Sequence, residues 1–258
     1  MEFENIIYEV KNRIAFITFN RPKALNALNR ALLQEMKAAL DSLEKNDEVR
    51  VLILSGAGEK AFVAGADISE LGTMDSVEGR DFSDLGHEVM DKLQSLSIPV
   101  IASVKGFALG GGSEIALACD FIYAAENAVF GLPELTLGLI PGFGGTQRLP
   151  RLVGKNMAKE LILTAEKIKA NRALELGIVN RVFSVEELDS SVLKTAEKIA
   201  SLGKWSVRAA KESVNTGMDV DLSAGCRIEK NAFSVCFSTY DAKEGTKAFL
   251  EKRAPAFK

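Results

Sequence analysis

Histidine is nearly absent from this chain of 258 residues, because His87 is the only one. A catalytic triad or a multi-histidine zinc site would have to depend on that single side chain. His87 lies in residues 80–96, whose apolar residues recur at helical spacing, so we expect a packed or solvent-facing histidine. The G-x-S-x-G and Walker A motifs are absent from the sequence. Serine-hydrolase, zinc and P-loop chemistry are therefore disfavoured.

Cysteine is also scarce, with Cys119, Cys226 and Cys236 as the full set. An odd number without metal-type spacing favours reduced thiols, a cytoplasmic location and no metal site. Residues 1–4 are acidic and lack the basic region that precedes the apolar stretch of a secretory signal, so no such signal is expected.

A surplus of positive charge is missing too, since 32 Lys and Arg face 35 Asp and Glu for a net charge of -3. We therefore expect neither a nucleic-acid groove nor a patch for anionic membranes. No apolar run approaches the roughly 20 residues that cross a bilayer. Hydrophobic residues make up 47% of the chain, which suffices for one large or two small domains with a well-buried core.

Apolar runs alternate with helical patterns through the first two thirds of the chain. Residues 6–10 and 13–20 indicate a hairpin, and Asn29 is a good cap for a helix over 29–45. This alternation predicts an α/β core whose strands are covered on both sides. Further strands are expected at 49–54, 99–104 and 120–125, further helices at 80–96, 111–119, 146–152 and 155–163, and a glycine- and alanine-rich loop at 56–66.

After residue 183 the pattern becomes purely helical. The expected helices span residues 185–202, 205–216, 222–237 and 241–252. A helical region without strands predicts a small subdomain or an oligomerisation region.

One glycine motif suggests a dinucleotide site, because residues 56–61 match G-x-G-x-x-A after the strand at 49–54. The fingerprint needs a helix that begins within the motif, so that its N-terminus faces the pyrophosphate. Residues 62–67 are a poor helix start, and the second strand that should precede an acidic residue is missing. NAD binding is therefore disfavoured.

Two glutamates stand in glycine-rich segments 20 residues apart. Glu114 ends the run Gly110-Gly111-Gly112-Ser113, and Glu134 follows Pro133 ahead of the glycine-rich residues 140–148. Glycines let backbone N–H groups approach a ligand closely, and a carboxylate beside such donors suits acid–base chemistry. The plainer alternatives are a tight strand-to-helix connection, an ordinary first-turn glutamate at 114 and an exposed turn residue at 134.

Taken together, these segments resemble the crotonase superfamily, and most closely its bacterial short-chain enoyl-CoA hydratases. The resemblance rests on residues 20–22, 64–68, 110–114, 133–134 and 140–142, and it continues through 144–149, 173–179 and 249–253. It implies an α/β crotonase-like spiral of ββα-type repeats, with two roughly perpendicular sheets, over residues 1–200. A C-terminal helical trimerisation region would follow over residues 201–258, giving a homotrimer or a homohexamer built from two trimers.

The resemblance also implies roles for five residues. Glu114, ionised, would deprotonate the attacking water, and Glu134, protonated, would give a proton to the α-carbon of the substrate. The amides of Ala66 and Gly111 would form an oxyanion hole for the thioester, and the amide of Gly142 would help to hold the water. Two close carboxyl groups resist double ionisation, so a single shared proton suits such a pair.

Coenzyme A would enter as part of the substrate, without a metal or a redox cofactor. Its matched contacts are Lys23, Ala24, Leu25, Ala64, Ala66, Asp67, Ile68, Phe249 and Lys252, the last two reaching the CoA of a neighbouring subunit. The alternatives are solvated charges for the two lysines and a core position for Phe249. Residues 68–79 and the helix at 81–96 are expected to line the acyl pocket.

Three residues depart from the common pattern of the family. Ser113 replaces a frequent cysteine, Leu132 a frequent glutamine, and Ser69 a lysine that lies near the adenine in some relatives. The first two would alter pocket polarity and substrate choice.

The activity implied by the resemblance is the reversible syn addition of water to a 2-trans-enoyl-CoA, giving a 3-hydroxyacyl-CoA in fatty acid metabolism. An enoyl-CoA isomerase and a hydratase of a cyclic dienoyl-CoA are the closest alternatives. A non-catalytic CoA-binding protein is disfavoured by the intact pair of glutamates, and an RNA-binding role by the acidic net charge.

Overall fold

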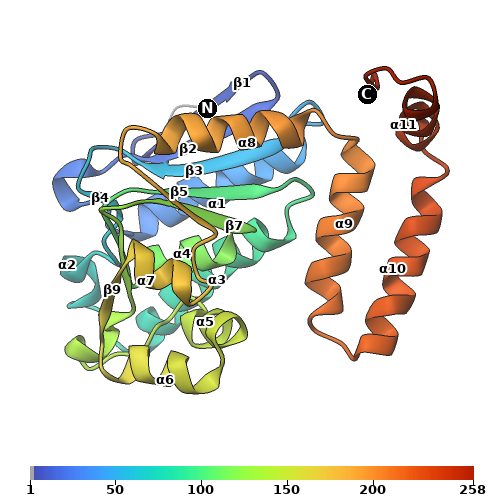
Figure 1. Cartoon of the computed structure of the whole chain (residues 1–258). Coiled ribbons are helices and arrows are strands. Elements are labelled where there is room, and N and C mark those ends of the chain that lie inside the picture. Colours follow the sequence, from blue (N-terminus) through green and yellow to red (C-terminus); the bar gives the residue numbers. More distant parts are fainter. Residues whose placement is uncertain (1–2) are drawn as a thin grey trace.

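The computed structural model describes residues 3–258 (Figure 1). Two sheets form the centre of the body, helices cover them, and the last three helices lie to one side. Met1 and Glu2, which belong to the acidic segment discussed above, lie outside the described residues. No helix in the described part of the chain is long and apolar enough to cross a membrane.

The larger sheet has six strands in the order β1-β2-β3-β5-β7-β10. β1 and β2 form the predicted antiparallel hairpin, and β2, β3, β5, β7 and β10 are parallel to one another. Parallel strands buried on both faces carry continuous apolar sequence, as β3 and β5 do. The strands are β1 (Ile6–Lys11), β2 (Ile14–Phe19), β3 (Val51–Gly56), β5 (Val100–Val104), β7 (Phe121–Ala125) and β10 (Arg181–Phe183).

Helices cover both faces of this sheet. α1 (Arg30–Glu44) and α3 (Ser76–Ser95) belong to the main apolar cluster on one side. α8 (Leu188–Ala200) packs on the other side, where it forms a second cluster with side chains of β2, β3 and β5. The predicted Asn29 cap is confirmed, because its side chain accepts a hydrogen bond from the amide of Leu32.

α3 begins four residues before the predicted start at residue 80. Asp75 accepts hydrogen bonds from the amides of Val77 and Glu78, and the Glu78 side chain accepts one from the Asp75 amide. This capping box starts the helix ahead of its apolar pattern. Periodicity alone therefore placed the beginning of the helix too late.

The smaller sheet corrects the prediction of a loop over residues 56–66. It has the order β4-β6-β8-β9, and β4, β6 and β8 run parallel. Three-residue strands are too short to show an alternating pattern, so periodicity does not reveal them. A strand rather than a helix also follows the Gly56 motif, so the N-terminus that a dinucleotide fingerprint needs is not there. The strands are β4 (Ala61–Val63), β6 (Phe107–Leu109), β8 (Val129–Gly131) and β9 (Lys167–Lys169).

Short helices follow the strands of the smaller sheet and place the residues of interest. The predicted helices at 111–119, 146–152 and 155–163 are confirmed to within a residue at each end. The elements are η1 (Pro22–Ala24), α2 (Ile68–Leu71), α4 (Gly111–Ala118), η2 (Pro133–Leu137), α5 (Gly145–Val153), α6 (Lys155–Leu163) and α7 (Ala170–Glu175).

The C-terminal part is helical, as predicted, with α9 (Lys204–Gly217), α10 (Leu222–Cys236) and α11 (Tyr240–Leu250). α9 and α10 run side by side, away from the two sheets (Figure 1). α9 is attached to the body by Lys211, whose Nζ donates to Asp120 Oδ2 at 2.8 Å and to the carbonyl of Ile98 at 2.9 Å. The division of the chain after residue 200 stays a prediction.

A substitution at Gly112 tests the packing of α4 on β4. A Cβ at Gly112 would lie 2.0 Å from the carbonyl oxygen of Val63, a backbone atom that cannot move aside. We expect Gly112→Ala to lower the free energy of unfolding by about 1–3 kcal/mol, measured by urea denaturation. Gly79→Ala is the control, because Gly79 is helical and a Cβ there meets nothing within 4 Å. The control should be neutral or stabilising, and equal stability of both variants would contradict the packing argument.

Candidate active site

The site lies where the carboxyl ends of β4, β6 and β8 meet. Three loops follow these parallel strands, and they touch at Gly110. A Cβ at Gly110 would lie 2.9 Å from Glu134 Oε1 and 3.5 Å from the Cα of Gly65. Gly110 and Gly65 also have φ angles of +50° and +107°, which side chains disfavour. The predicted segments 64–68, 110–114 and 133–134 are thus brought together.

Glu114 lies in the first turn of α4, and its side chain points into the protein. The residue is only 1% exposed. Its Oε1 accepts hydrogen bonds from the amides of Phe143 and Gly145, both at 2.8 Å. The partners come from a loop about 30 residues away in sequence rather than from the same helix. A simple pairing with the helix dipole therefore does not account for Glu114.

Burial is the main reason that the pKa of Glu114 is raised from 4.5 to about 7. The hydrogen bond from Gly145 opposes this shift because it favours the ionised form, and the bond from Phe143 acts in the same direction. The charge of Glu134 adds to the increase. Glu114 is thus a carboxyl group that can exchange a proton near neutral pH.

Glu134 follows Pro133 in the first turn of η2 and is half-buried. Burial raises the pKa of its carboxyl group. Its Oε2 is inaccessible to solvent and has no hydrogen-bond partner among residues 3–258. An unpaired buried oxygen favours the protonated acid, whereas the two amides at Glu114 favour a carboxylate. The hydrogen-bond surroundings thus favour the carboxylate form at Glu114 and the acid form at Glu134, while burial raises the pKa of both groups.

The amides of Ala66 and Gly111 are free to bind a ligand. Ala66 lies between Gly65 and Asp67, and both of these form backbone hydrogen bonds with Leu28. The Leu28 amide donates to the Gly65 carbonyl, and the Asp67 amide donates to the Leu28 carbonyl. Gly111 is the first residue of α4, where helical amides lack internal partners. Within the described part of the chain, neither amide donates a hydrogen bond. Two free donors next to two carboxyl groups suit an oxyanion site.

Gly142 stands next to the loop that binds Glu114. Its carbonyl accepts a hydrogen bond of 2.6 Å from Ser83 Oγ on α3. The neighbouring Phe143 ring packs so closely on α3 that a Cβ at Gly86 would lie 2.1 Å from it. Ser83 therefore helps to place the loop, and sequence reasoning missed it. No feature of the sequence distinguishes it from other polar residues of an amphipathic helix.

The proposed CoA loop at residues 23–25 lies against the segment 64–68. The amide of Ala64 donates to the carbonyl of Leu25 at 3.1 Å. Arg21 forms an ion pair with Asp67 at 2.9 Å. Asn26, which is fully buried, donates to the carbonyls of Ala57 and Ala61. Arg21 and Asn26 are supporting residues that the prediction did not identify, although Arg21 lies in the Asn-Arg-Pro segment that marked the resemblance.

Phe249 and Lys252 are not brought to this site within one chain. Phe249 lies in the last turn of α11 and Lys252 just after it, and α11 lies above the end of α10, apart from the two sheets and α2 (Figure 1). Phe249 is 84% exposed, so the alternative of a core position for it is wrong. A contact of these residues with the site needs a second copy of the chain.

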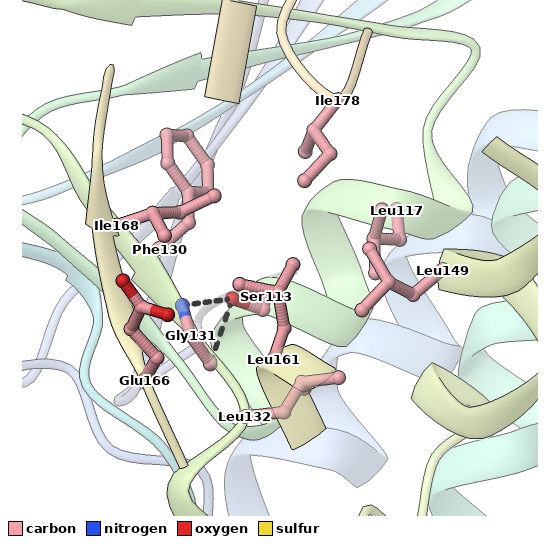
Figure 2. Close-up of a pocket in the computed structure, with 10 residues that line it drawn as sticks. All are labelled: Ser113, Leu117, Phe130, Gly131, Leu132, Leu149, Leu161, Glu166, Ile168 and Ile178. Carbon is pink, nitrogen blue, oxygen red and sulfur yellow. Dashed lines mark hydrogen bonds between the residues drawn. The ribbon is translucent and has the colours of Figure 1, made fainter. Parts of the chain in front are cut away.

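Two of the departures from the family pattern, Ser113 and Leu132, line a small cavity of about 30 Å³ behind α4 (Figure 2). The Ser113 hydroxyl donates to the carbonyl of Ala108 at 2.6 Å and accepts from the amide of Gly131 at 3.2 Å. It thereby links α4 to β6 and β8. The third, Ser69, donates to Asp67 Oδ1 at 2.6 Å at the start of α2. In residues 3–258 no cluster of side chains could hold a metal ion.

Comparisons with known proteins agree over almost the whole chain. The family model described as enoyl-CoA hydratase/isomerase matches residues 9–258. The short-chain-enoyl-CoA hydratase of Clostridium acetobutylicum is 51% identical over 98% of this chain and 97% of its own length. The crotonyl-CoA hydratase of Syntrophomonas wolfei is 49% identical over 100% and 99%.

Solved structures give the same result. The crystal structure of enoyl-CoA hydratase from Bacillus anthracis superposes with a TM-score of 0.96 at 45% identity, covering 99% of both chains. The predicted crotonase-like α/β fold is therefore confirmed. The chain belongs to the enoyl-CoA hydratase/isomerase family.

Proposed function

We propose that this chain is an enzyme that adds water reversibly, in the syn sense, to a 2-trans-enoyl-CoA and gives a 3-hydroxyacyl-CoA. One observation supports the proposal above others: Glu114 and Glu134, in different electrostatic surroundings, flank two free backbone amides. Two relatives of about half-identical sequence are named short-chain-enoyl-CoA hydratase and crotonyl-CoA hydratase.

The amides of Ala66 and Gly111 bind the thioester oxygen. Negative charge grows on that oxygen as water adds and the α-carbon becomes enolate-like. Each donor of this kind is worth about 3–4 kcal/mol of barrier. The N-terminus of α4 adds a favourable dipole at Gly111. These amides therefore stabilise the transition state more than the neutral substrate.

The two carboxyl groups divide the proton transfers. Glu114 removes a proton from water held with the help of the Gly142 amide, and the oxygen forms a bond to the β-carbon. Glu134 gives its proton to the α-carbon. One molecule of water has then been added across the double bond, and a proton returned from Glu114 to Glu134 restores the starting state. Burial of both groups keeps their pKa values in a range where these transfers are feasible.

Coenzyme A enters with the substrate, and neither a metal nor a redox cofactor takes part in the proposed reaction. Residues 23–25 and 64–68 form the CoA contacts of one chain. Phe249 and Lys252 supply contacts from a second copy, since Phe249 is exposed and α11 lies apart from the sheets that carry the site of its own chain (Figure 1). The active form would then have at least two copies, and the resemblance to the family favours a homotrimer or a homohexamer. The three free cysteines suit a reducing cytoplasm.

Neutral variants of the two glutamates test the proposed reaction. Glu114→Gln and Glu134→Gln should each lower turnover of crotonyl-CoA by about 10²-fold or more, because each removes a general acid or base. The measurement is the loss of absorbance of the conjugated thioester as water adds. Glu126→Gln is the control, since Glu126 is exposed. Near-parental turnover in either site variant would contradict the role given to that residue.

A panel of 2-enoyl- and 3-enoyl-CoA substrates would separate hydration from isomerisation.

The raised pKa of Glu114 predicts how stability depends on pH. A carboxyl group with a higher pKa in the folded protein binds protons more readily when folded, so its contribution to stability falls as the pH rises from 4.5 through about 7. Glu114→Gln removes this group but keeps an acceptor for both amides. Its free energy of unfolding, relative to the parent, should therefore rise by roughly 2–3 kcal/mol between about pH 5 and pH 8. Parallel stability curves for the two proteins would contradict a raised pKa.

The proposed assembly is tested by sedimentation together with kinetics. We expect the purified protein to sediment as three or six chains. Lys252→Ala should raise KM for the acyl-CoA several-fold with little change in kcat, because it removes a contact to CoA and leaves the glutamates intact. Lys243→Ala, at an exposed position earlier on α11, is the control. A fully active monomer would contradict the contribution of a second copy.

A further inference from the structure

A second hollow lies apart from the glutamates, between α8 and the larger sheet. It is a cleft of about 310 Å³ at the carboxyl ends of the parallel strands β3 and β5. In open α/β sheets this edge is where ligands bind. The turn at Gly56 and Gly58, which the dinucleotide motif singled out, forms part of its wall. None of the residues assigned above to catalysis or CoA lines this cleft.

Ser103 on β5 contributes a hydroxyl group without a partner. The residue is 3% exposed, and its Oγ forms no hydrogen bond within residues 3–258. The nearby Ser55, in contrast, pairs its Oγ with Thr18 Oγ1 at 3.0 Å. A buried hydroxyl that lacks a partner costs free energy, so Ser103 favours any ligand that accepts its hydrogen bond.

Lys105 brings a positive charge to the same wall. Its Nζ lies 2.6 Å from Asp189 Oδ2, but the lysine side chain is 26% exposed and that of Asp189 is 69% exposed. Most of the lysine side chain is thus covered, but its hydrogen bond to Asp189 lies at the exposed mouth of the cleft. The N-terminus of the 13-residue helix α8 adds its dipole at Leu188. An incoming anion competes for Lys105 with the Asp189 carboxylate, which also lines the cleft.

The other side chains of the cleft are apolar. Phe16 and Ile53 come from the sheet, and Val192 and Leu193 come from α8. A ligand that fills this cleft needs one anionic group to contact Lys105 and Ser103. It also needs an aliphatic chain to pack against the apolar side chains. A second charge on the ligand would meet no second cation among the lining residues.

We propose that this cleft is a second, non-catalytic binding site for a short-chain monocarboxylate. The carboxylate accepts hydrogen bonds from Ser103 Oγ and Lys105 Nζ, and the alkyl chain packs between β2, β3 and α8. The proposal does not depend on the reaction at Glu114 and Glu134, because the two sites share no lining residue.

Ligand-detected NMR with hexanoate tests the site on the full chain. Coenzyme A is kept at saturation, so that binding at the proposed CoA site is blocked. We expect saturable binding of hexanoate that is weakened about tenfold or more in Ser103→Ala and in Lys105→Met, because each variant loses a hydrogen bond to a charged group. 1-Hexanol, which has the same chain without the charge, should bind more weakly than hexanoate and should not distinguish Lys105→Met from the parent.

Lys155→Met is the matched control, since it removes an exposed lysine on α6 and should leave hexanoate binding unchanged. Thermal unfolding of each variant establishes that it is folded, and Ser103→Ala is expected to be stable because its hydroxyl has no partner to lose. Three results would overturn the proposal: no saturable binding of hexanoate, complete displacement of hexanoate by coenzyme A, or equal affinity in Lys105→Met and the parent.

Discussion

The site depends on how one buried carboxylate is held. Glu114 is removed from solvent, and an ionised group in that position is tolerated only when polar partners surround it. The amides of Phe143 and Gly145 provide these partners, so the loop that carries them must fold over α4. That loop is in turn fixed by the Ser83 hydrogen bond and by the Phe143 ring against α3. The position of α3 thereby influences the charge of the Glu114 side chain on α4.

Much of this arrangement could be predicted from the sequence. Glu114 and Glu134 were identifiable because glycines and acids cluster around them in a pattern that resembles a known family. The long helices and the buried strands of the larger sheet were identifiable from their apolar periodicity. The strands β4, β6 and β8 were not, because three residues cannot show a period, although the order of these strands is what brings the loops together.

Other parts of the site could not be predicted because they arise from contacts between distant segments. Asn26 has the composition of an ordinary turn residue, and only the fold shows that its side chain joins two loops. Ser83 likewise is one of several polar residues on α3. The place of Phe249 is a different case, since it is exposed in a single chain and the role proposed for it requires a second copy.

The glycines around the glutamates limit how this site can change over evolution. A side chain at Gly111 would collide with Leu28, one at Gly110 would reach Glu134 Oε1, and one at Gly145 would come within 3.0 Å of Glu114 Oε1. Because the main chain itself forms the binding surface, ordinary point substitutions there damage the scaffold before they can adjust selectivity. The segment between α2 and α3 is less constrained, because Thr73 and Asp75 are exposed and a loop at the surface accepts changes of side chain or length more readily than these glycines do.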